Sequence, residues 1–335
     1  ILTSHSPAIV KRVEPENIRY FRICNEHKYT KVNPIILPDE EKEAEKFKFV
    51  KEAVLAYPEL YFAKLVVLGE GDSEEIIIRK MIELKDESVD SSEISIVPLG
   101  GRHVNHFWRL LNDLEIPFIT LLDLDRERYG GGWGRIKYAI QQLIEIGCDK
   151  NTLLKIKNGI LSDEQLENMH TWDVANTEIM SGWIEHLKRY GVYFSTPLDI
   201  DFAMLQSFKD KYISLLTSSE GPRIKDYRRI KSYIRIQDIV INEDTEDELK
   251  NAYESRIDSD IKSTLKQEGG DGATYTKEEK ELMIWYSYFF LGRGKPTTHL
   301  SLLSNSTDLD FESFPNCLKE FVSCVIEKNK DNLGD

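Results

Sequence analysis

Three apolar segments that alternate with helical patterns are the feature that most constrains the fold of this chain. The apolar segments read KLVVLGE, ISIVPLGG and PFITLLDLD and lie at residues 64–70, 94–101 and 117–125. The helical patterns follow them at residues 72–85, 104–115 and 134–147. Near-continuous apolar strands separated by helices are typical of a parallel sheet that is covered on both faces. The sequence therefore predicts an α/β fold, with a parallel sheet flanked by helices.

The rest of the chain predicts further elements around this sheet. Short strands are expected at residues 17–23 and 32–38, a helix at 39–57, and another strand within 191–205. Residues 206–290 are predicted to be mostly helical, with a polar interruption at 267–273, and 291–303 to form a turn and a helix. We expect four regions: an N-terminal one, the sheet domain, a helical insertion and a C-terminal part, at residues 1–60, 61–205, 206–290 and 291–335.

Composition narrows the class of protein. The 335 residues carry a formal net charge of −14, which disfavours a protein that coats nucleic acid non-specifically but agrees with an acidic metal site. The four cysteines are widely spaced and form no CxxC pair, which argues against a zinc cage or a disulfide framework and favours the cytoplasm. We find no signal peptide and no apolar run long enough to span a bilayer, and so expect no membrane partner.

Acidic residues lie at the ends of two of the predicted strands. Glu70 ends the first apolar segment, and Asp123 and Asp125 end the third. Alternate residues of a strand point to the same face, and open α/β sheets bind ligands at the carboxyl ends of their strands. Glu74 lies one turn into the following helix and can face the same point. The pattern therefore predicts one acidic cluster at this edge of the sheet.

Several carboxylates this close together repel one another, and a divalent cation removes that penalty. Mg²⁺ prefers hard oxygen ligands and commonly meets its substrate through phosphate, so the cluster predicts a site for one or two Mg²⁺ or Mn²⁺ ions. The alternative is that the aspartates cap a helix or lie in a solvated loop. For Glu74 the alternative is an acid that is favoured in the first helical turn by the helix dipole.

The quoted motifs resemble a known domain. VVLGEGDSEE, ISIVPLGGRHV and IPFITLLDLD together resemble a Toprim domain, a metal-dependent, Rossmann-like fold of topoisomerases, primases and some nucleases. The Gly-Gly-Arg after the second segment and the later Gly-Arg-Gly-Lys-Pro resemble the OLD (overcoming lysogenization defect) nucleases, which include the nuclease subunit of Gabija-type phage defence. The resemblance covers roughly residues 64–205 and 291–303. It implies an N-terminal ABC-type ATPase followed by a Toprim nuclease.

The first residues agree with this resemblance. ILTSHSP is similar to the last strand and switch-histidine loop of an ABC-type ATPase, with His5 as the sensor of the γ-phosphate. The sequence contains no GxxxxGK[ST] phosphate loop, and it starts at Ile1 rather than Met. We therefore expect these residues to be the remnant of an ATPase domain of a longer protein, which would bind ATP.

The resemblance also implies further site residues. Asp199 or Asp201 would hold a second metal ion; the family often has Leu-Glu where this chain has Leu198-Asp199, so both positions stay open. The alternative role for one of the two is to cap the helix that follows. Lys295 in GRGKP would lie against the scissile phosphate, assisted by Arg293. A solvated turn lysine is the alternative.

Candidate DNA contacts come from two basic segments. Arg102 follows a glycine pair at a strand end, where backbone N–H groups and a cation can meet phosphate. The run RIKDYRRIKSYIRI (223–236) interleaves basic residues with tyrosines, and from it we select Arg228, Arg229 and Lys231. A solvated helix face is the alternative for that run. His299 is interpreted as a surface or packed histidine.

These features predict a metal-dependent DNA endonuclease, with Glu70, Asp123 and Lys295 as catalytic residues. The resemblance further implies control by ATP, a homodimer or higher homo-oligomer, and a helicase partner in phage defence. Two alternatives stay open. One is a non-catalytic Toprim module for dimerisation, and the other is topoisomerase-like cleavage through one of the 15 tyrosines.

Overall fold

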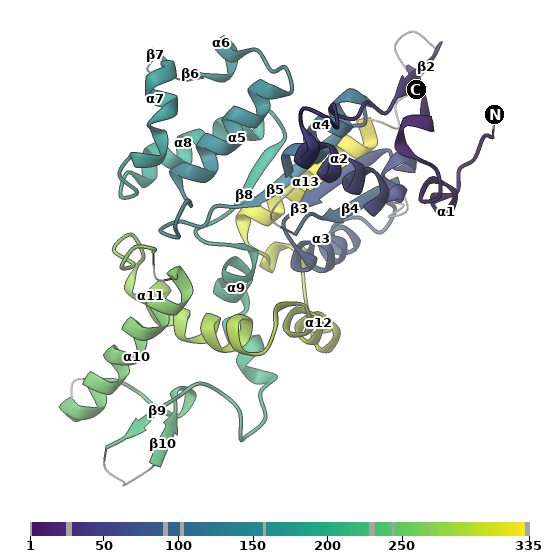
Figure 1. Cartoon of the computed structure of the whole chain (residues 1–335). Helices are drawn as coiled ribbons and strands as arrows, with labels where there is room; N and C mark the ends of the chain where they lie inside the picture. The colour runs from purple at the N-terminus through teal and green to yellow at the C-terminus, as the bar shows by residue number, and fades with distance from the viewer. Residues whose placement is uncertain are drawn as a thin grey trace.

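A four-stranded parallel sheet forms the centre of the protein, which we describe from a computed structural model (Figure 1). The structure describes residues 2–24, 29–89, 93–100, 104–156, 159–227, 232–242, 245–266 and 268–331. In spatial order the strands are β4 (Ile94–Pro98), β3 (Leu65–Gly69), β5 (Phe118–Asp123) and β8 (Val192–Ser195). All neighbouring pairs are parallel, so the predicted fold class is confirmed.

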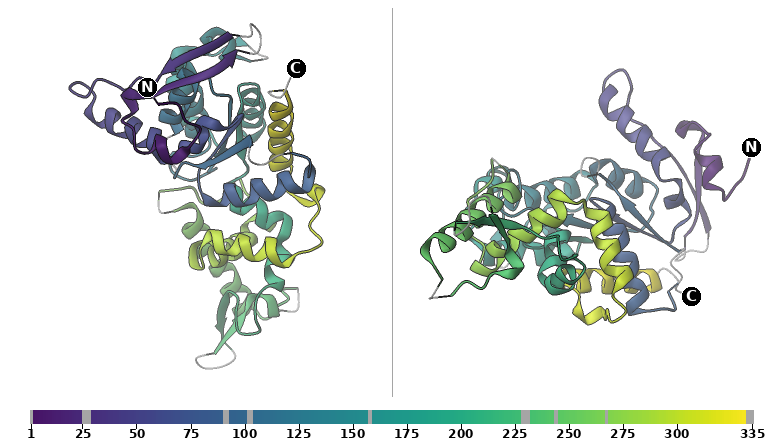
Figure 2. Two further views of the ribbon diagram at one scale, coloured as in Figure 1. Left: turned by 90° about the vertical axis from the view of Figure 1, so that its right-hand side faces the viewer. Right: turned by 90° about the horizontal axis from the view of Figure 1, so that it is seen from below.

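Helices cover both faces of this sheet (Figure 2). One face packs against α3 (Asp72–Lys85), α9 (Ile200–Ser214), α12 (Lys295–Asn305) and α13 (Asn316–Asp331). The other face packs against α2 (Ala44–Ala56), α4 (Val104–Asp113), α5 (Trp133–Glu145) and α8 (Thr177–Lys188). Because both faces are covered, successive β3 residues Leu65 to Leu68 are all fully buried. This explains the unbroken apolar runs in the sequence.

Short elements complete the two ends of this body. The N-terminal ones are α1 (Pro7–Val10) and the antiparallel pair β1 (Arg19–Cys24) and β2 (Tyr29–Pro34). Between α5 and α8 lie α6 (Lys150–Leu153), β6 (Lys155–Ile156), β7 (Gly159–Ile160) and α7 (Asp163–Glu167). Single 3-10 turns occupy Pro15–Asn17, Pro58–Phe62, Met169–Thr171, Ile236–Asp238 and Phe311–Ser313. Within the described ranges, no helix has the length and apolar character that a bilayer crossing requires.

The segment predicted to be mostly helical needs correction. It contains α10 (Asp247–Leu265), α11 (Lys277–Tyr286) and a π-helical continuation at Ser287–Gly292, but also an antiparallel hairpin of β9 (Arg223–Asp226) and β10 (Ser232–Arg235). The basic run is therefore a hairpin and not a helix face. In Figure 1 the hairpin lies at the end of the molecule farthest from the sheet. Helix α9 runs across residue 205, where the sequence placed a region boundary.

Candidate metal centre

Glu70 and Asp123 meet because their strands are neighbours. Glu70 directly follows β3, and Asp123 is the last residue of β5, which pairs with β3. The Glu70 carboxylate accepts the backbone N–H of Asp123 at 3.0 Å. The Asp123 Oδ1 atom in turn accepts the Ser195 hydroxyl at 2.7 Å. Both acids therefore lie at the carboxyl edge of the sheet, where we expected the acidic cluster.

Asp125 reaches the same place by a different route from the one predicted. The strand ends at Asp123, and Asp125 has a left-handed φ of 53°, so the two do not alternate along one strand. Instead the chain turns sharply, and a Cβ on Gly131 would lie 1.8 Å from the Asp125 carbonyl oxygen. The glycine run is needed because the backbone closes over Asp125 there. Asp123, Asp125 and Asp199 each offer a carboxylate oxygen, and these atoms lie within 4.8 Å of one another.

Asp199 and Asp201, between which the sequence left the metal-holding role open, make different contacts in the structure. Asp199 caps α9, since its Oδ1 accepts the Phe202 N–H at 2.9 Å, and its Oδ2 lies 2.5 Å from the Tyr286 hydroxyl. Asp201 lies inside the first turn of α9, where its Oδ1 accepts the Ser73 hydroxyl at 2.8 Å. The capping alternative therefore holds for Asp199, although its second oxygen still faces the acidic cluster.

Glu74 is both a helix-start acid and a member of the cluster. It lies in the first turn of α3, and its Oε2 accepts the Gly71 N–H at 3.0 Å. Its side chain is 2% exposed. Burial raises the pKa of Glu74 to about 8, and the charges of Asp201 and Glu70 add to the rise. Burial and these neighbouring charges therefore favour the protonated form of Glu74.

Cations within the chain neutralise most of the other carboxylates. Arg135 donates to Asp125 at 2.5 Å and lies 3.1 Å from Glu70. Arg128 lies 2.6 Å from Asp125 and 3.0 Å from Asp199. Burial raises the pKa of Asp125, but the ion pairs with Arg128 and Arg135 outweigh burial and lower it. Sequence reasoning missed both arginines, because no pattern marks Arg128 in the turn before the glycines or Arg135 in the first turn of α5.

Lys295 is the third cation of the site. It is the first residue of α12, and its Nζ lies 2.6 Å from Asp201 and 3.8 Å from Asp199. Its side chain is 41% exposed, so it borders both the acids and the solvent. Burial lowers the pKa of Lys295, but Asp199 and Asp201 more than compensate and raise it. The lysine is therefore charged, as a phosphate contact requires.

Asp123 and Glu74 differ from the other acids of the cluster. In the described part of the chain, neither carboxylate forms an ion pair with a lysine, arginine or histidine. Desolvation raises the pKa of Asp123 well above its usual value, and repulsion from Glu70, Glu74 and Asp199 contributes. Uncompensated carboxylates at this depth are what a divalent cation would stabilise. The carboxylate oxygens of Asp123 and Glu74, together with those of Glu70, are hard donors of the kind that Mg²⁺ and Mn²⁺ prefer.

His299 is a site residue that the sequence did not reveal. It is fully buried, as the packed interpretation required, and stacks on Phe290 with 5.0 Å between ring centroids. Its Nε2 lies 2.7 Å from Asp201, and its Nδ1 lies 2.8 Å from the Tyr212 hydroxyl. Burial raises the pKa of Asp201, but His299 and Lys295 outweigh it and lower it. His299 therefore fixes the orientation of Asp201.

The turn after Asp125 joins the acidic cluster to helices α10 and α11. Arg126 donates to the Thr274 carbonyl at 3.0 Å. The Glu127 carboxylate accepts the N–H groups of Gly272 and Thr274, each at 2.7 Å. Arg128 donates to the Thr264 carbonyl at the end of α10 at 3.0 Å. Three consecutive side chains thus anchor the insertion to the segment that carries the acids.

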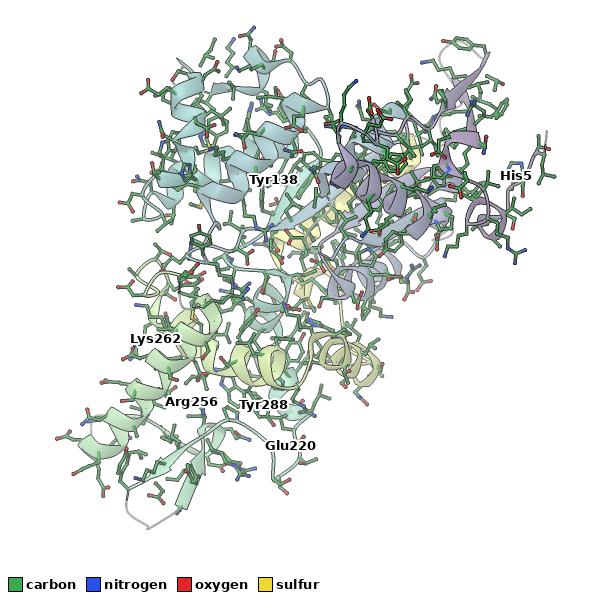
Figure 3. All side chains as sticks on the ribbon, in the orientation of Figure 1. His5, Tyr138, Glu220, Arg256, Lys262 and Tyr288 are labelled. Carbon is green, nitrogen blue, oxygen red and sulfur yellow. The ribbon has the colours of Figure 1, made fainter. Side chains whose placement is uncertain are left out.

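The remaining predicted residues lie away from the cluster or outside the described residues. Arg293 pairs with Glu220 at 3.1 Å on the surface. His5 is exposed in a segment without regular structure, 6.1 Å from the Phe62 ring by centroids, and Figure 3 places it at the N-terminal periphery. The expected strand in ILTSHSP is absent from the described residues 2–6. Arg102, Arg228, Arg229 and Lys231 lie outside the described residues.

Comparison with known families identifies the domain that holds this site. Residues 61–125, which include Glu70, Glu74, Asp123 and Asp125, match the model of the Toprim domain of proteins like the overcoming lysogenization defect protein. Residues 61–125 are thus similar to an OLD-like Toprim domain. The resemblance found in the sequence motifs is thereby confirmed over these residues.

Curated relatives are considerably longer than this chain. Endonuclease GajA of Bacillus cereus strain HuB5-5 is 24% identical over 238 residues, which are 67% of this chain and 33% of that protein. Endonuclease GajA of strain VD045 is 29% identical over 133 residues, which are 40% of this chain and 22% of that protein. The chain thus spans a third or less of the length of these relatives.

Solved structures of similar regions also match. The C-terminal region of the Xanthomonas campestris pv. campestris OLD protein aligns with a TM-score of 0.43 and 16% identity over 82% of this chain and 99% of that chain. The C-terminal region of the Burkholderia pseudomallei OLD protein aligns with a TM-score of 0.43 and 15% identity over 82% of this chain and 100% of that chain.

Proposed function

We propose that this chain is a metal-dependent DNA endonuclease that hydrolyses phosphodiester bonds. The observation that carries the proposal is a pair of carboxylates that form no ion pair with any described residue, the buried Glu74 and the half-buried Asp123, at the carboxyl edge of an OLD-like Toprim sheet. The similarity to proteins named endonuclease GajA supports the reaction class.

The residues divide into ion-holding and phosphate-facing groups. Glu70, Glu74 and Asp123 would hold the first Mg²⁺ or Mn²⁺ ion, with Asp125, Asp199 and Asp201 available to a second. A divalent ion at this edge supplies Lewis acidity and neutralises the charge that develops during hydrolysis. Lys295 faces the solvent beside the acids and at the N-terminus of α12, so it can stabilise a phosphate oxygen.

The longer relatives motivate proposals about the complete protein. We infer that an ABC-type ATPase domain with His5 at its switch position gates the nuclease in response to ATP. We further infer a homo-oligomer, beginning with a homodimer, and a helicase partner, with a role in defence against phage. Arg102, Arg228, Arg229, Lys231 and Arg293 are proposed to contact DNA.

The deciding experiment compares supercoiled plasmid incubated with the chain and Mg²⁺ or Mn²⁺ against the same mixture in EDTA. Asp123→Ala should lose nicking by about 10²-fold or more, because it removes an ion-holding oxygen. Lys295→Ala should lose about 10²-fold, the magnitude typical of a lost transition-state contact. Asp308→Ala and Lys319→Ala are matched controls on the surface, and both should cut like the wild type.

The alternatives predict different outcomes. A non-catalytic Toprim module would leave the plasmid intact and show no heat of Mn²⁺ binding in calorimetry. A topoisomerase-like enzyme would leave a covalent protein–DNA adduct. Tyr286, the tyrosine that contacts Asp199, is fully buried and also hydrogen-bonded to Arg128, which disfavours it as a nucleophile.

A further inference from the structure

The β9–β10 hairpin has two chemically different faces. The strands pair Ile224 with Ile234 and Lys225 with Tyr233. Side chains alternate across a strand, so these two pairs lie on opposite faces. The face with Ile224 packs into the protein, since Ile224 is 4% exposed and belongs to the apolar core. The other face is left to the solvent.

Three residues of the solvent face form what we call the stacking platform: Lys225, Tyr227 and Tyr233. Tyr227 is 57% exposed and Tyr233 is 66% exposed. The Lys225 Nζ lies 5.0 Å from the centroid of the Tyr227 ring, so the cation and the ring share one side of the hairpin. Within the described ranges no carboxylate pairs with Lys225. The platform therefore offers two exposed aromatic rings and a cation that pairs with no carboxylate of the described residues.

The two arginines on the same face are used differently. Arg223 donates to the Ser219 carbonyl at 2.6 Å. Arg235 donates to Asp238 at 2.6 and 2.9 Å. Both guanidinium groups therefore stabilise the base of the hairpin. The three platform residues are then the side chains of the described part of this face that can contact a ligand.

Charge favours a polyanionic ligand. Residues 223–236 contain six basic residues and one acidic residue, Asp226, in a chain of net charge −14. Asp226 is 5% exposed and faces inward, so it does not oppose the positive charge of the outer face. A basic segment in an acidic chain favours a phosphate-bearing ligand at this segment over the rest of the chain.

The hairpin is joined to the metal centre by one helix. Arg256 of α10, labelled in Figure 3, donates to the Arg223 carbonyl at 2.9 Å, and Thr264 of the same helix accepts from Arg128. Thr264 lies eight residues after Arg256, a rise of about 12 Å along the helix. A single helix thus connects the hairpin to the segment that carries the acids.

We propose that the stacking platform binds an unpaired stretch of the DNA substrate, an inference that rests on the proposed nuclease function. Exposed aromatic rings bind nucleic acid by stacking on base faces, which are accessible only in unpaired DNA. Lys225 supplies a phosphate contact beside each ring. Duplex DNA would meet the cation but leave both rings without a base.

The test measures binding separately from cleavage. Fluorescence anisotropy is followed in EDTA with the full chain carrying Asp123→Asn, using a labelled 20-nucleotide oligothymidine and a 20-base-pair duplex as probes. Tyr227→Ala and Tyr233→Ala should each weaken oligothymidine binding by about tenfold or more and leave duplex binding within about twofold. Tyr→Phe at either position should retain binding, because the ring is kept. Lys225→Ala should reduce the slope of log affinity against log salt by about 0.7 for the single strand.

Matched controls come from the other hairpins of the chain. Phe21→Ala on the β1–β2 hairpin removes an aromatic ring of similar exposure, and Lys155→Ala removes a lysine from the β6–β7 hairpin. Both should bind like the parent, and equal melting temperatures of all variants show that the fold is kept. Oligothymidine binding that survives both tyrosine substitutions, or an equal loss for the duplex, would overturn the proposal. Failure of the plasmid assay with normal single-strand binding would instead contradict the nuclease and leave the platform.

Discussion

At the scale of single residues, Glu74 should set the pH dependence of stability in the metal-free protein. Its pKa is raised from 4.5 to about 8, so its contribution is complete below about pH 4.5 and is lost as the pH rises through about 8. Glu74→Gln keeps an oxygen that can accept the Gly71 N–H but carries no charge. We expect the variant to be more stable than the wild type by about 1–3 kcal/mol at pH 8.5 and to show a flatter pH profile.

Thermal unfolding in EDTA between pH 5.5 and 8.5 measures this difference, with the exposed Glu312→Gln as the control. Mn²⁺ at pH 8.5 should stabilise the wild type more than Glu74→Gln, because the ion then needs the carboxylate. Parallel pH profiles for the two proteins would show that Glu74 is not held protonated by the fold.

Some residues of the acidic cluster could be predicted from the sequence, and others could not. Glu70 and Asp123 could be located because strand ends of a parallel sheet meet at one edge. Arg128 and Arg135 could not, since their contacts depend on how the turn at Asp125 and the start of α5 lie against the acids and not on any periodic pattern. His299 was interpreted as a surface or packed histidine; it is packed, and its contact with Asp201 depends on how α12 lies against α9.

At the scale of elements, Glu127 should act as the clamp on the loop between α10 and α11. Its backbone carbonyl accepts the Gly270 N–H at 2.7 Å, and its carboxylate accepts two further N–H groups of that loop. Glu127→Gln places an amide N–H₂ where a second acceptor is needed, which should cost about 1–3 kcal/mol. Hydrogen–deuterium exchange of residues 268–276 should accelerate, and Mn²⁺ binding should weaken because Arg128 follows directly.

The control for this clamp is Glu87→Gln, an exposed residue of the same type. Unchanged exchange in the loop of Glu127→Gln would mean that the glycines alone fix its conformation. Normal exchange together with weaker Mn²⁺ binding would place Glu127 in the site rather than in the clamp.

Element prediction succeeded where the burial pattern was simple. Strands β3 and β5 are buried on both faces, so apolar residues follow one another and the type of element is evident. The β9–β10 hairpin was mistaken for helix because only Ile224 and Ile234 are apolar on its inner face, while Asp226 takes a buried position. Two apolar residues cannot establish a period of two against a background of basic residues.

At the scale of the whole molecule, the sheet separates two apolar cores. One joins α3, α9 and the inserted helices, and includes Trp285 at 3% exposure. The other joins α2, α4, α5 and α8 and includes Trp108, Trp133 and Trp183, with Trp172 packed against it. Because the same strands contribute side chains to both cores, we expect the insertion to unfold together with the sheet. The regions 61–205 and 206–290 would then form one cooperative unit.

The tryptophans allow this cooperativity to be measured directly. Trp285→Ala removes the one tryptophan of the insertion core and should cost about 3–5 kcal/mol. The four remaining tryptophans lie in or against the opposite core, so their fluorescence reports on the far side of the sheet. If the protein unfolds cooperatively, Trp285→Ala should lower the denaturant midpoint seen by tryptophan fluorescence. The midpoint seen by circular dichroism should fall by the same amount. Trp285→Phe, which silences the same fluorophore but keeps an aromatic ring against Phe289, is the matched control and should move both transitions much less. A different outcome would be a fluorescence midpoint of Trp285→Ala that equals that of the control, together with a circular dichroism transition in two steps. The helices α10 and α11 would then fold as a separate unit, and the contacts of Arg126, Glu127 and Arg128 would not couple them to the sheet.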